Sequence, residues 1–276
     1  MPELPEVESV LRQLRRHVLG TTIRSIWVGR QDIIREGIDQ LPWYEGACIQ
    51  DIQRYGKTLL FTCEKGQGSQ FLLAELGMTG RFLFHGVPQK FAVHTHMVVY
   101  LATSHTPELR YWNARRFGRI YLLNAHDWQE LRGRRFGLDP LSVEPMAFIA
   151  LIQQSRGRLK AFLMNQQKIA GIGNIYANEI LHRAGIHPHA SGNRLKKKTL
   201  HRLFATMQAV LQEAIVCGGS TIRDFCTPDG SPGCFQERHQ VYQKTGTFCL
   251  RGCGTRIRRL SQERSAFFCP TCQKRR

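Results

Sequence analysis

The hydrophobic pattern of this 276-residue chain changes once, and that change most constrains the fold it can adopt. Up to residue 123, short segments rich in β-branched and aromatic residues follow one another with brief turns between them. From about Pro145 onward, apolar residues recur at helical spacing instead. Strands followed by helices predict an α+β protein, with an antiparallel β-sandwich or barrel first and a helical domain after it.

The same pattern assigns individual elements. A helix is expected first, because apolar residues recur at helical spacing from Leu4 to Val18 and Pro5 suits the first turn. Seven strands are predicted, at 22–28, 47–54, 58–63, 71–76, 97–101, 109–112 and 120–123, and four later helices, at 146–154, 159–165, 175–184 and 196–217. Residues 133–143 predict a hinge beside an interdomain cleft, and residues 221–244, which lack periodicity, predict a long mobile loop that covers a site.

The charge balance predicts a polyanionic partner. Lys and Arg outnumber Asp and Glu by 39 to 21, which gives a net charge of +18. Nucleic acid is the leading candidate, and a membrane surface is the competing one. No apolar run approaches the roughly 20 residues of a membrane-spanning helix, and the acidic amino terminus does not resemble a signal peptide. We therefore expect a cytosolic protein.

Four of the nine cysteines have the spacing of a metal site. Three residues separate Cys249 from Cys253, two separate Cys269 from Cys272, and the stretch between the pairs can form a hairpin. Four thiolates suit tetrahedral zinc, which would be structural because the protein fills every position. The alternative is four unrelated buried thiols, and the remaining cysteines show no pairing that suggests a role.

The first residues offer a nucleophile. Removal of Met1 would leave Pro2 with a secondary amine, and a chain-terminal amine has a reference pKa of about 8, so part of it is unprotonated near neutral pH. Its attack on an aldehyde-like carbon would give an iminium ion, which is an electron sink. Glu3 lies outside the helical periodicity and could serve as an acid beside the amine. The alternative is that these residues simply begin a helix.

Two turns are also candidates. Residues 171–176 place two glycines before a predicted helix capped by Asn174, which would suit a phosphate or would be a plain turn. Residues 115–119 set Phe117 among arginines where one strand turns into the next. That aromatic residue could wedge between stacked bases, or it could be a core residue in a charged turn.

Five motifs in order resemble one family, bacterial formamidopyrimidine-DNA glycosylase. They are Pro2–Glu8, Leu76–Gly80, Arg115–Gly118, Gly171–Tyr176 and the terminal cysteine ribbon. The resemblance implies an N-terminal antiparallel β-sandwich preceded by a helix, and a C-terminal helix-two-turn-helix domain with a β-hairpin zinc finger that holds one structural zinc ion. The implied boundaries are 1–132 for the catalytic β-sandwich domain, 133–145 for the hinge, 146–220 for the helix-two-turn-helix domain, 221–244 for a lesion-capping loop and 245–276 for the zinc finger.

The resemblance also implies a bifunctional base-excision enzyme. Such an enzyme removes oxidised purines, such as 8-oxoguanine and formamidopyrimidines, from double-stranded DNA and then cleaves the strand by β,δ-elimination. By similarity, Pro2 attacks C1′ of the damaged nucleotide and Glu3 donates a proton that helps open the sugar. Lys57 is similar to the family lysine associated with β-elimination, and Arg264 to the arginine of phosphate contact and δ-elimination. A monomer in the bacterial cytosol is implied.

Other positions match family contacts with DNA. Met78, Arg115 and Phe117 match the side chains that fill the space left by the extruded nucleotide. The further DNA-contact positions are His94, Arg156, Lys160 and Asn174. For His94 the alternative is a place on a strand face, with His96, and no ligand role.

The sequence departs from the family pattern at several positions. The first cysteine pair has three intervening residues where the family usually has two, which puts the geometry of that knuckle in question. The other departures are Glu75 for a histidine, Asn113–Ala114 for Asp-Pro, Asn165 for an aspartate and Cys234–Phe235 for Tyr-Phe. None removes a residue with an implied catalytic role.

Three other functions compete. An endonuclease VIII-like glycosylase would use the same mechanism on oxidised pyrimidines, but Leu4 and the Met78, Arg115 and Phe117 set favour the purine enzyme. A zinc-containing DNA-binding protein without catalysis would not need Pro2 and Glu3. A zinc-ribbon RNA-binding protein would leave the amino terminus unexplained.

Overall fold

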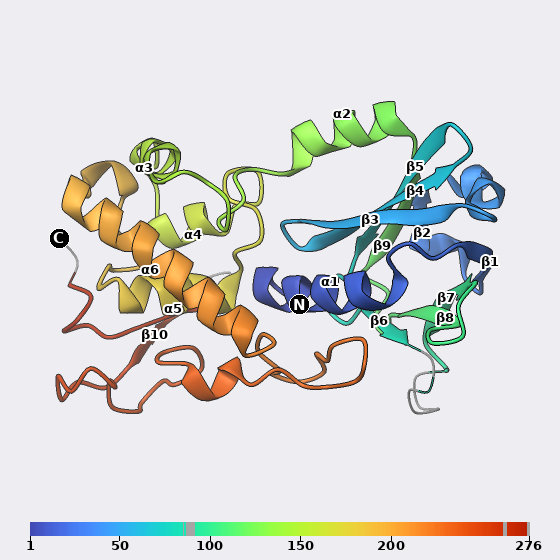
Figure 1. Cartoon of the computed structure of the whole chain (residues 1–276). Helices are drawn as coiled ribbons and strands as arrows, with labels where there is room; N and C mark the ends of the chain where they lie inside the picture. Colours follow the sequence, from blue (N-terminus) through green and yellow to red (C-terminus); the bar gives the residue numbers. More distant parts are fainter. Residues whose placement is uncertain (85, 87–91, 262–263, 275–276) are drawn as a thin grey trace. The chain divides into compact units, whose positions relative to one another are not determined.

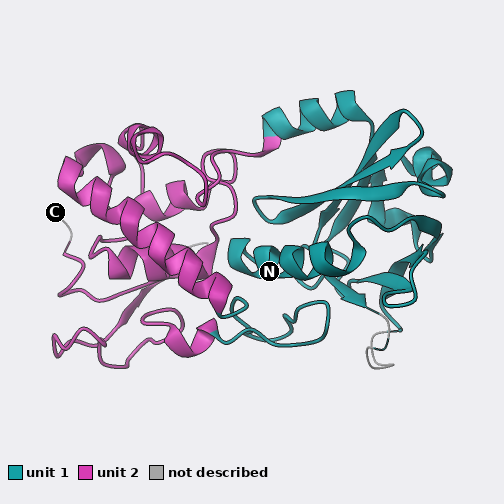
Figure 2. Ribbon diagram, in the orientation of Figure 1, with its two compact units in different colours: residues 1–134, 217–234 teal, residues 135–216, 235–276 magenta. Residues whose placement is uncertain are grey.

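A computed structural model describes residues 1–84, 86, 92–261 and 264–274 (Figure 1). The chain forms two compact units, and each contains two separate stretches of sequence (Figure 2). Unit 1 comprises residues 1–134 and 217–234, and unit 2 comprises residues 135–216 and 235–276. Among the described residues, no helix is both long enough and apolar enough to cross a bilayer.

Unit 1 is a two-sheet sandwich with one helix before it. Helix α1 (Leu4–Val18) leads into a four-stranded sheet of order β1-β7-β8-β6 and a five-stranded sheet of order β2-β9-β5-β4-β3. The first sheet contains β1 (Ile23–Val28), β6 (Arg81–Phe84), β7 (Thr95–Leu101) and β8 (Glu108–Trp112). The second contains β2 (Ile34–Glu36), β3 (Cys48–Tyr55), β4 (Thr58–Lys65), β5 (Gly68–Glu75) and β9 (Arg119–Leu123). Neighbouring strands are antiparallel except β2 and β9, which are parallel.

One apolar core joins the two sheets and α1. Phe61 of β4 and Phe82 of β6 meet edge to face across it, with ring centroids 5.5 Å apart. From α1, Val7, Leu14 and Val18 are fully buried in this core. Each such side chain contributes about 1.5–3 kcal/mol through burial. The core therefore fixes the helix that carries the amino-terminal residues against the sandwich.

All seven predicted strands of unit 1 are confirmed, whereas three elements were missed. The missed strands β2 and β6 have three and four residues, which is too short for a periodic signal. Helix α2 (Ala125–Arg135) was missed because it buries only Trp128 and Leu131 and so has no apolar stripe. Two 3₁₀ turns, η1 (Gln31–Ile33) and η2 (Ile38–Tyr44), connect the early strands.

Unit 2 is helical and ends in a hairpin, as predicted. Its helices are α3 (Pro145–Gln153), α4 (Leu159–Leu163), α5 (Asn174–Arg183) and α6 (Lys197–Val216). Two 3₁₀ turns, η4 (Gly192–Arg194) and η5 (Phe235–Arg238), precede and follow α6. Strands β10 (Arg258–Leu260) and β11 (Ala266–Phe268) pair antiparallel between the two cysteine pairs.

The long loop predicted at 221–244 belongs partly to each unit. Its first part is bonded to the sandwich rather than loose, because the N–H of Phe84 donates to the carbonyl of Pro228 at 3.0 Å. Inside the loop, Asp229 accepts the hydroxyl of Thr227 at 2.7 Å and the N–H of Ser231 at 3.0 Å. These bonds make residues 227–231 an ordered turn.

Candidate functional site

The first site element is the start of α1. Pro2 is buried, and Glu3, which is 4% exposed, is the residue before the first helical turn. The backbone N–H of Glu3 donates to Oε2 of Glu6 at 2.7 Å, as in a capping box. Glu6 therefore fixes the backbone next to Pro2. The three-residue spacing of Glu3 and Glu6 is typical of a capping box, so the sequence contained a signal for this cap, but Glu6 was predicted only as part of the helix.

Glu6 also binds the loop that follows α6. Its Oε1 accepts the backbone N–H of Ser220 at 2.6 Å, and its side chain is 1% exposed. Gly219 adopts φ +83°, and a Cβ there would lie 2.6 Å from the same oxygen. Only glycine allows the loop to approach the carboxylate so closely. One buried side chain thus joins residues 3 and 220 in unit 1.

Lys57 lies in the turn between β3 and β4. Gly56, with φ +57°, forms this turn and Lys57 is half-buried. The end of β3 is tied to α1 because Arg54 Nε donates to Glu8 Oε2 at 2.9 Å, with both side chains largely buried. Arg54 also donates to the carbonyl of Gly56 at 3.2 Å. This ion pair anchors the lysine's turn to the helix that begins at Leu4.

Two neighbouring turns carry the predicted void-filling residues. Met78 and Phe117 are 42% and 54% exposed, and the Arg115 guanidinium carbon lies 5.3 Å from the Phe117 ring centroid. A Cβ on Gly77 would lie 2.5 Å from the backbone nitrogen of Gly118, so the two turns touch. Phe117 is therefore an exposed aromatic residue rather than a core residue.

Asn113 holds these two turns together. Its side chain is fully buried, and its Oδ1 accepts the hydroxyl of Thr79 at 3.0 Å and the N–H of Arg116 at 3.1 Å. Thr79 in turn accepts the N–H of Arg115 at 3.1 Å. The sequence marked Asn113 only as a departure from the family pattern, since its partner lies 34 residues away.

Two histidines lie near the Asn113 turn. His94 directly precedes β7, and His96 is in β7. His94 is half-buried, with its ring 5.7 Å from that of Trp112. His96 is buried, its Nε2 lies 3.0 Å from the carbonyl of Asn113, and burial lowers its pKa. His96 therefore supports the Asn113 turn, and His94 is the more accessible of the two.

In unit 2, Lys160 joins three segments. Its Nζ donates to Asn174 Oδ1 at 2.6 Å and to the carbonyls of Arg264 and Ser265 at 2.8 and 2.9 Å. The side chain is 3% exposed, and these bonds engage all three of its donors. Lys160 thus fixes the backbone at Arg264 against α4 and α5.

The predicted helix cap was wrong by one residue, because Gly173 is the cap and α5 begins at Asn174.

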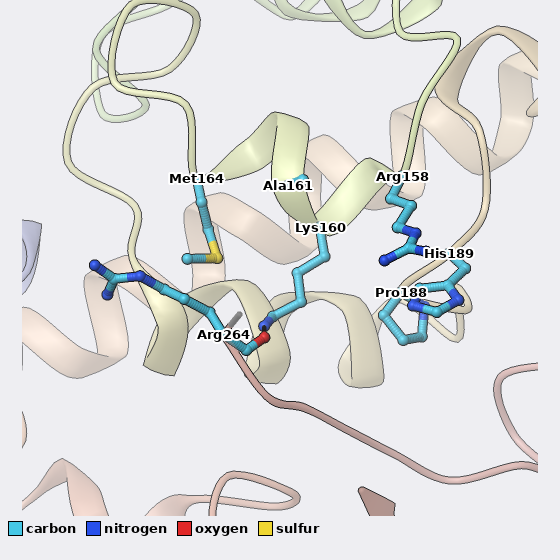
Figure 3. Close-up of a pocket in the computed structure, with 7 residues that line it drawn as sticks. All are labelled: Arg158, Lys160, Ala161, Met164, Pro188, His189 and Arg264. Carbon is cyan, nitrogen blue, oxygen red and sulfur yellow. Dashed lines mark hydrogen bonds between the residues drawn. The ribbon is translucent and has the colours of Figure 1, made fainter. Parts of the chain in front are cut away.

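The exposed Arg264 side chain borders a cationic pocket of about 300 Å³ (Figure 3). Lys160 lies between the Arg264 guanidinium on one side and Arg158 with His189 on the other. Arg156 is exposed on the same loop as Arg158, and its carbonyl accepts the Ser191 hydroxyl at 3.2 Å. The arginines of this pocket suit contacts with phosphate groups, and the charge of the buried Lys160 adds to the positive potential there.

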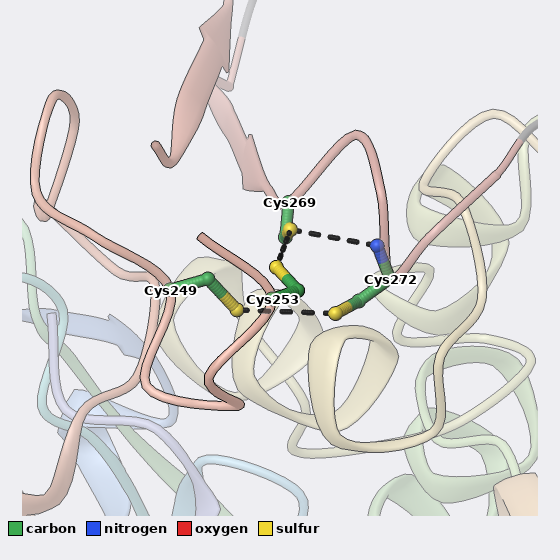
Figure 4. Close-up of side chains that lie close together, drawn as sticks. All are labelled: Cys249, Cys253, Cys269 and Cys272. Atoms are coloured by element: carbon green, nitrogen blue, oxygen red, sulfur yellow. Dashed lines mark hydrogen bonds between the residues drawn. The ribbon is translucent and has the colours of Figure 1, made fainter. Parts of the chain in front are cut away.

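The four ribbon cysteines converge (Figure 4). Their sulfur atoms all lie within 4.8 Å of one another, with Cys249 and Cys272 at 4.0 Å and Cys253 and Cys269 at 3.5 Å. Four sulfurs bound tetrahedrally at 2.3 Å would be about 3.8 Å apart. The cluster therefore fits a zinc ion, and the three-residue spacing after Cys249 does not prevent convergence.

The predicted site residues divide between the two units. Pro2 and Glu3 lie in unit 1 with Lys57 and the two exposed turns, whereas Lys160, Asn174 and Arg264 lie in unit 2 with the cysteine cluster. The main residues that sequence reasoning missed are Glu6, Glu8 and Asn113. Apart from the glutamate spacing at residues 3 and 6, no sequence signal identified them, because their partners are distant in the chain.

Three family comparisons cover most of the chain. The formamidopyrimidine-DNA glycosylase N-terminal domain matches residues 1–120, the helix-two-turn-helix domain of the same glycosylases matches residues 136–226, and a zinc finger found in FPG and IleRS matches residues 246–275. The last of these contains all four clustered cysteines, so the cluster is a structural zinc site.

Individual relatives match over their full length. A formamidopyrimidine-DNA glycosylase of Solibacter usitatus is 40% identical over 278 residues, covering 100% of both chains. The crystal structure of MutM (Fpg) from Thermus thermophilus superposes with a TM-score of 0.85 at 38% identity, covering 99% of this chain and 98% of that one. A complex of Lactococcus lactis Fpg with abasic-site DNA gives a TM-score of 0.85 at 33% identity, covering 99% and 100%.

Proposed function

Because the chain belongs to the formamidopyrimidine-DNA glycosylase family of glycosylases and abasic-site lyases, we propose that it excises oxidised purines from double-stranded DNA through a covalent intermediate on Pro2. The proposed lesions are 8-oxoguanine and formamidopyrimidines. The proposed strand cleavage is a β,δ-elimination that leaves a one-nucleotide gap. The observation that carries this proposal is the pair Pro2 and Glu3 at the buried, capped start of α1.

The proposed chemistry begins after Met1 has been removed. The amine of Pro2 forms a bond to C1′ of the damaged nucleotide while the bond from C1′ to the base breaks. The Pro2 nitrogen loses its proton, the base leaves with a proton, and the nitrogen is left as a neutral amine on C1′. Glu3 gives a proton to the ring oxygen of the sugar, so the ring opens and an iminium forms between Pro2 and C1′. Loss of a proton from C2′ then expels the 3′ phosphate, and a second elimination expels the 5′ phosphate. Water finally releases the sugar fragment from Pro2.

The unit 1 geometry supports these roles. The positive end of the α1 dipole lies beside Pro2 and disfavours an added positive charge on the amine. Glu6 holds the backbone of Glu3, so the backbone from which the acid side chain extends is fixed next to Pro2. We propose that Lys57 acts in β-elimination, because the Arg54 and Glu8 ion pair ties its turn to the same helix.

The exposed turns support base extrusion. Removing a nucleotide from the stack costs a few kcal/mol unless protein side chains replace its contacts. Met78 and Phe117 offer apolar surface at the tips of two touching turns, and Arg115 offers hydrogen-bond donors between them. We propose that these three side chains fill the void and contact the orphan base, with His94 binding the nearby backbone.

In unit 2 we propose contacts with the DNA backbone. Arg264, whose position Lys160 fixes, would contact a phosphate and assist δ-elimination. Asn174, at the start of α5, and Arg156 would bind neighbouring phosphates, since helix N-termini and arginines favour anions. The partner would be damaged double-stranded DNA bound by a monomer in the bacterial cytosol.

Borohydride trapping tests the central step. A duplex with 8-oxoguanine opposite cytosine is mixed with the mature protein and sodium borohydride, which reduces the iminium to a stable amine. We expect a covalent complex of protein and DNA on a denaturing gel, with the bond located at Pro2 by mass spectrometry. A form that retains Met1 should give at least tenfold less trapping, because its Pro2 nitrogen is an amide.

Pro5→Ala is the matched control, since Pro5 is also buried in the first turn but carries no free amine. It should trap as the unchanged protein does. Unchanged trapping by the form that retains Met1 would reject Pro2 as the nucleophile. Duplexes with an oxidised pyrimidine, tested side by side, distinguish the endonuclease VIII-like alternative, which predicts faster excision there.

A further inference from the structure

A buried histidine outside the cysteine motif contacts the zinc site. His182, near the end of α5, is 0% exposed, and its Nε2 lies 3.5 Å from the sulfur of Cys249. Its other ring nitrogen, Nδ1, lies 3.1 Å from the side-chain oxygen Oε1 of Gln240. The histidine is 67 residues from Cys249 in sequence, so the contact depends entirely on the fold.

A zinc site made of four thiolates needs hydrogen-bond donors around its buried sulfur atoms. Four thiolates around one Zn²⁺ carry a net charge of −2, and Cys249 and Cys269 are almost fully buried. Burying such charge is unfavourable unless donors around the sulfurs offset it. Cys269 has one, because the backbone N–H of Cys272 lies 3.5 Å from its sulfur. At Cys249, the Nε2 of His182 is the side-chain nitrogen within hydrogen-bond distance of the sulfur, in addition to a backbone hydrogen bond from Arg251.

We propose that His182 donates its Nε2–H to the zinc-bound thiolate of Cys249 and is thereby a positioning residue of the zinc site. A second contact lies at the same knuckle, where Arg251 donates to the backbone carbonyl of His182 at 3.3 Å. Residues 250–252 are the loop that has one residue more than the family's usual spacing. His182 therefore contacts both the first cysteine and the middle residue of this widened knuckle, and ties them to α5. The inference concerns the metal site alone and does not depend on the proposed lesion chemistry.

The proposal fixes the tautomer of His182. A zinc-bound thiolate has no proton, so a hydrogen bond to it requires a proton on Nε2. A neutral imidazole has only one such proton, so Nδ1 must accept. The side-chain amide of Gln240 must then be flipped from the orientation in which Oε1 faces Nδ1, so that its NH₂ donates to the ring. The backbone N–H of Gln240 donates to Glu179 Oε2 at 2.9 Å, which holds this residue in place. Glu179 and His182 of α5 thus both act on the chain that enters the zinc finger.

Nitrogen NMR of the unmodified, zinc-loaded protein tests this directly. Histidine labelled with ¹⁵N in the ring should show His182 with a protonated Nε2 and an unprotonated Nδ1. A proton on Nδ1 alone would overturn the proposal. This measurement needs no variant, so it holds even if substitution at this buried position prevents folding.

Variants test the consequence for the metal. His182→Phe keeps an aromatic ring but loses the donor, and zinc transfer to a coloured chelator should become about tenfold faster, or more. His182→Gln places an N–H near the same point and should restore most of the unchanged rate. His187→Phe is the matched control, because His187 is also buried in unit 2 but packs its ring on Phe268 at 4.9 Å.

A spectroscopic signature separates this role from a general loss of packing. With Co²⁺ in place of Zn²⁺, loss of a hydrogen bond makes the thiolate more electron-rich, so the sulfur-to-cobalt charge-transfer band should move to lower energy in His182→Phe. The band should not move in His187→Phe. An unchanged band and an unchanged zinc-transfer rate in folded His182→Phe would reject the proposal.

Discussion

At the scale of single residues, His239 shows how burial sets a response to pH. Its side chain is 3% exposed and its ring contacts those of Phe235 and Tyr242, with centroids 5.5 and 5.6 Å apart. Burial lowers the pKa of His239 to about 4, and the charges of Lys244 and Arg183 add to this effect. In the unfolded chain a histidine has a pKa of about 6.5. At pH values between these two pKa values, the unfolded chain therefore binds the proton more strongly than the folded protein does.

This difference predicts acid sensitivity of unit 2. The free energy of unfolding should decrease as the pH falls from 7 to 5, with about 2 kcal/mol of that decrease due to His239. In His239→Gln, which has no titrating ring, the decrease measured by urea unfolding should be smaller by that amount. His201→Gln, at an exposed position of α6, is the control and should keep the unchanged difference. Equal decreases in all three proteins would contradict the assignment.

At the scale of elements, the turn after β8 and the turn after β5 depend on one amide. Asn113 Oδ1 accepts from Thr79 of one turn and from Arg116 of the other, and its NH₂ donates to the Tyr111 hydroxyl at 3.3 Å. Arg116 adopts φ +56°, a left-handed conformation that a non-glycine residue adopts only when its surroundings hold it. The positions of Met78 and Phe117 therefore depend on a buried side chain that need not contact DNA.

Asn113→Ala should accordingly separate base excision from strand cleavage. The Thr79 hydroxyl loses its acceptor, which costs about 1–3 kcal/mol, while the N–H of Arg116 keeps only the backbone carbonyl of residue 113 at 3.2 Å. The side-chain link between the two turns is lost. Excision of 8-oxoguanine should fall about tenfold or more, whereas cleavage at a preformed abasic site should fall less, since no base has to be extruded. Asn113→Asp keeps the acceptor and should retain most of the excision.

The matched control is Asn124→Ala. Asn124 Oδ1 accepts the N–H of Asp127 at the start of α2, also in unit 1, and loss of such a cap costs about 1 kcal/mol. This variant should lose stability without losing excision. If Asn124→Ala and Asn113→Ala lose excision equally, general destabilisation explains the effect and the turn argument is wrong.

The elements that sequence predicted are those with a long periodic signal. Helices α1, α3, α5 and α6 repeat apolar residues over whole turns, and strands such as β4 are long enough for their composition to be recognised. Helix α2 and strands β2 and β6 have no such signal. In the site, the motifs predicted Pro2 and the cysteines, and the family resemblance implied Lys57, but Asn113 and His182 contact partners 34 and 67 residues away. Such pairs are properties of the fold and have no local pattern.

At the scale of the whole molecule, the positive charge is divided unevenly. Unit 2 contains 21 of the 39 Lys and Arg residues but only 6 of the 21 Asp and Glu residues. Most of the net charge of +18 therefore belongs to the unit that has the zinc finger and the pocket between Arg158 and Arg264. Binding to phosphates releases counterions, so it should weaken linearly in a plot of log affinity against log salt.

The slope of that plot counts the phosphates that the protein neutralises, at about 0.9 for each. Fluorescence anisotropy with a duplex that contains a stable abasic-site analogue should give a steep slope for the unchanged protein. Arg158→Gln should reduce it by about one, because this side chain borders the cationic pocket. Arg24→Gln, at an exposed position of β1 in unit 1, removes the same charge and should leave the slope nearly unchanged. Equal reductions would mean that net charge alone sets the affinity, whereas a reduction confined to Arg158→Gln places a phosphate at this pocket.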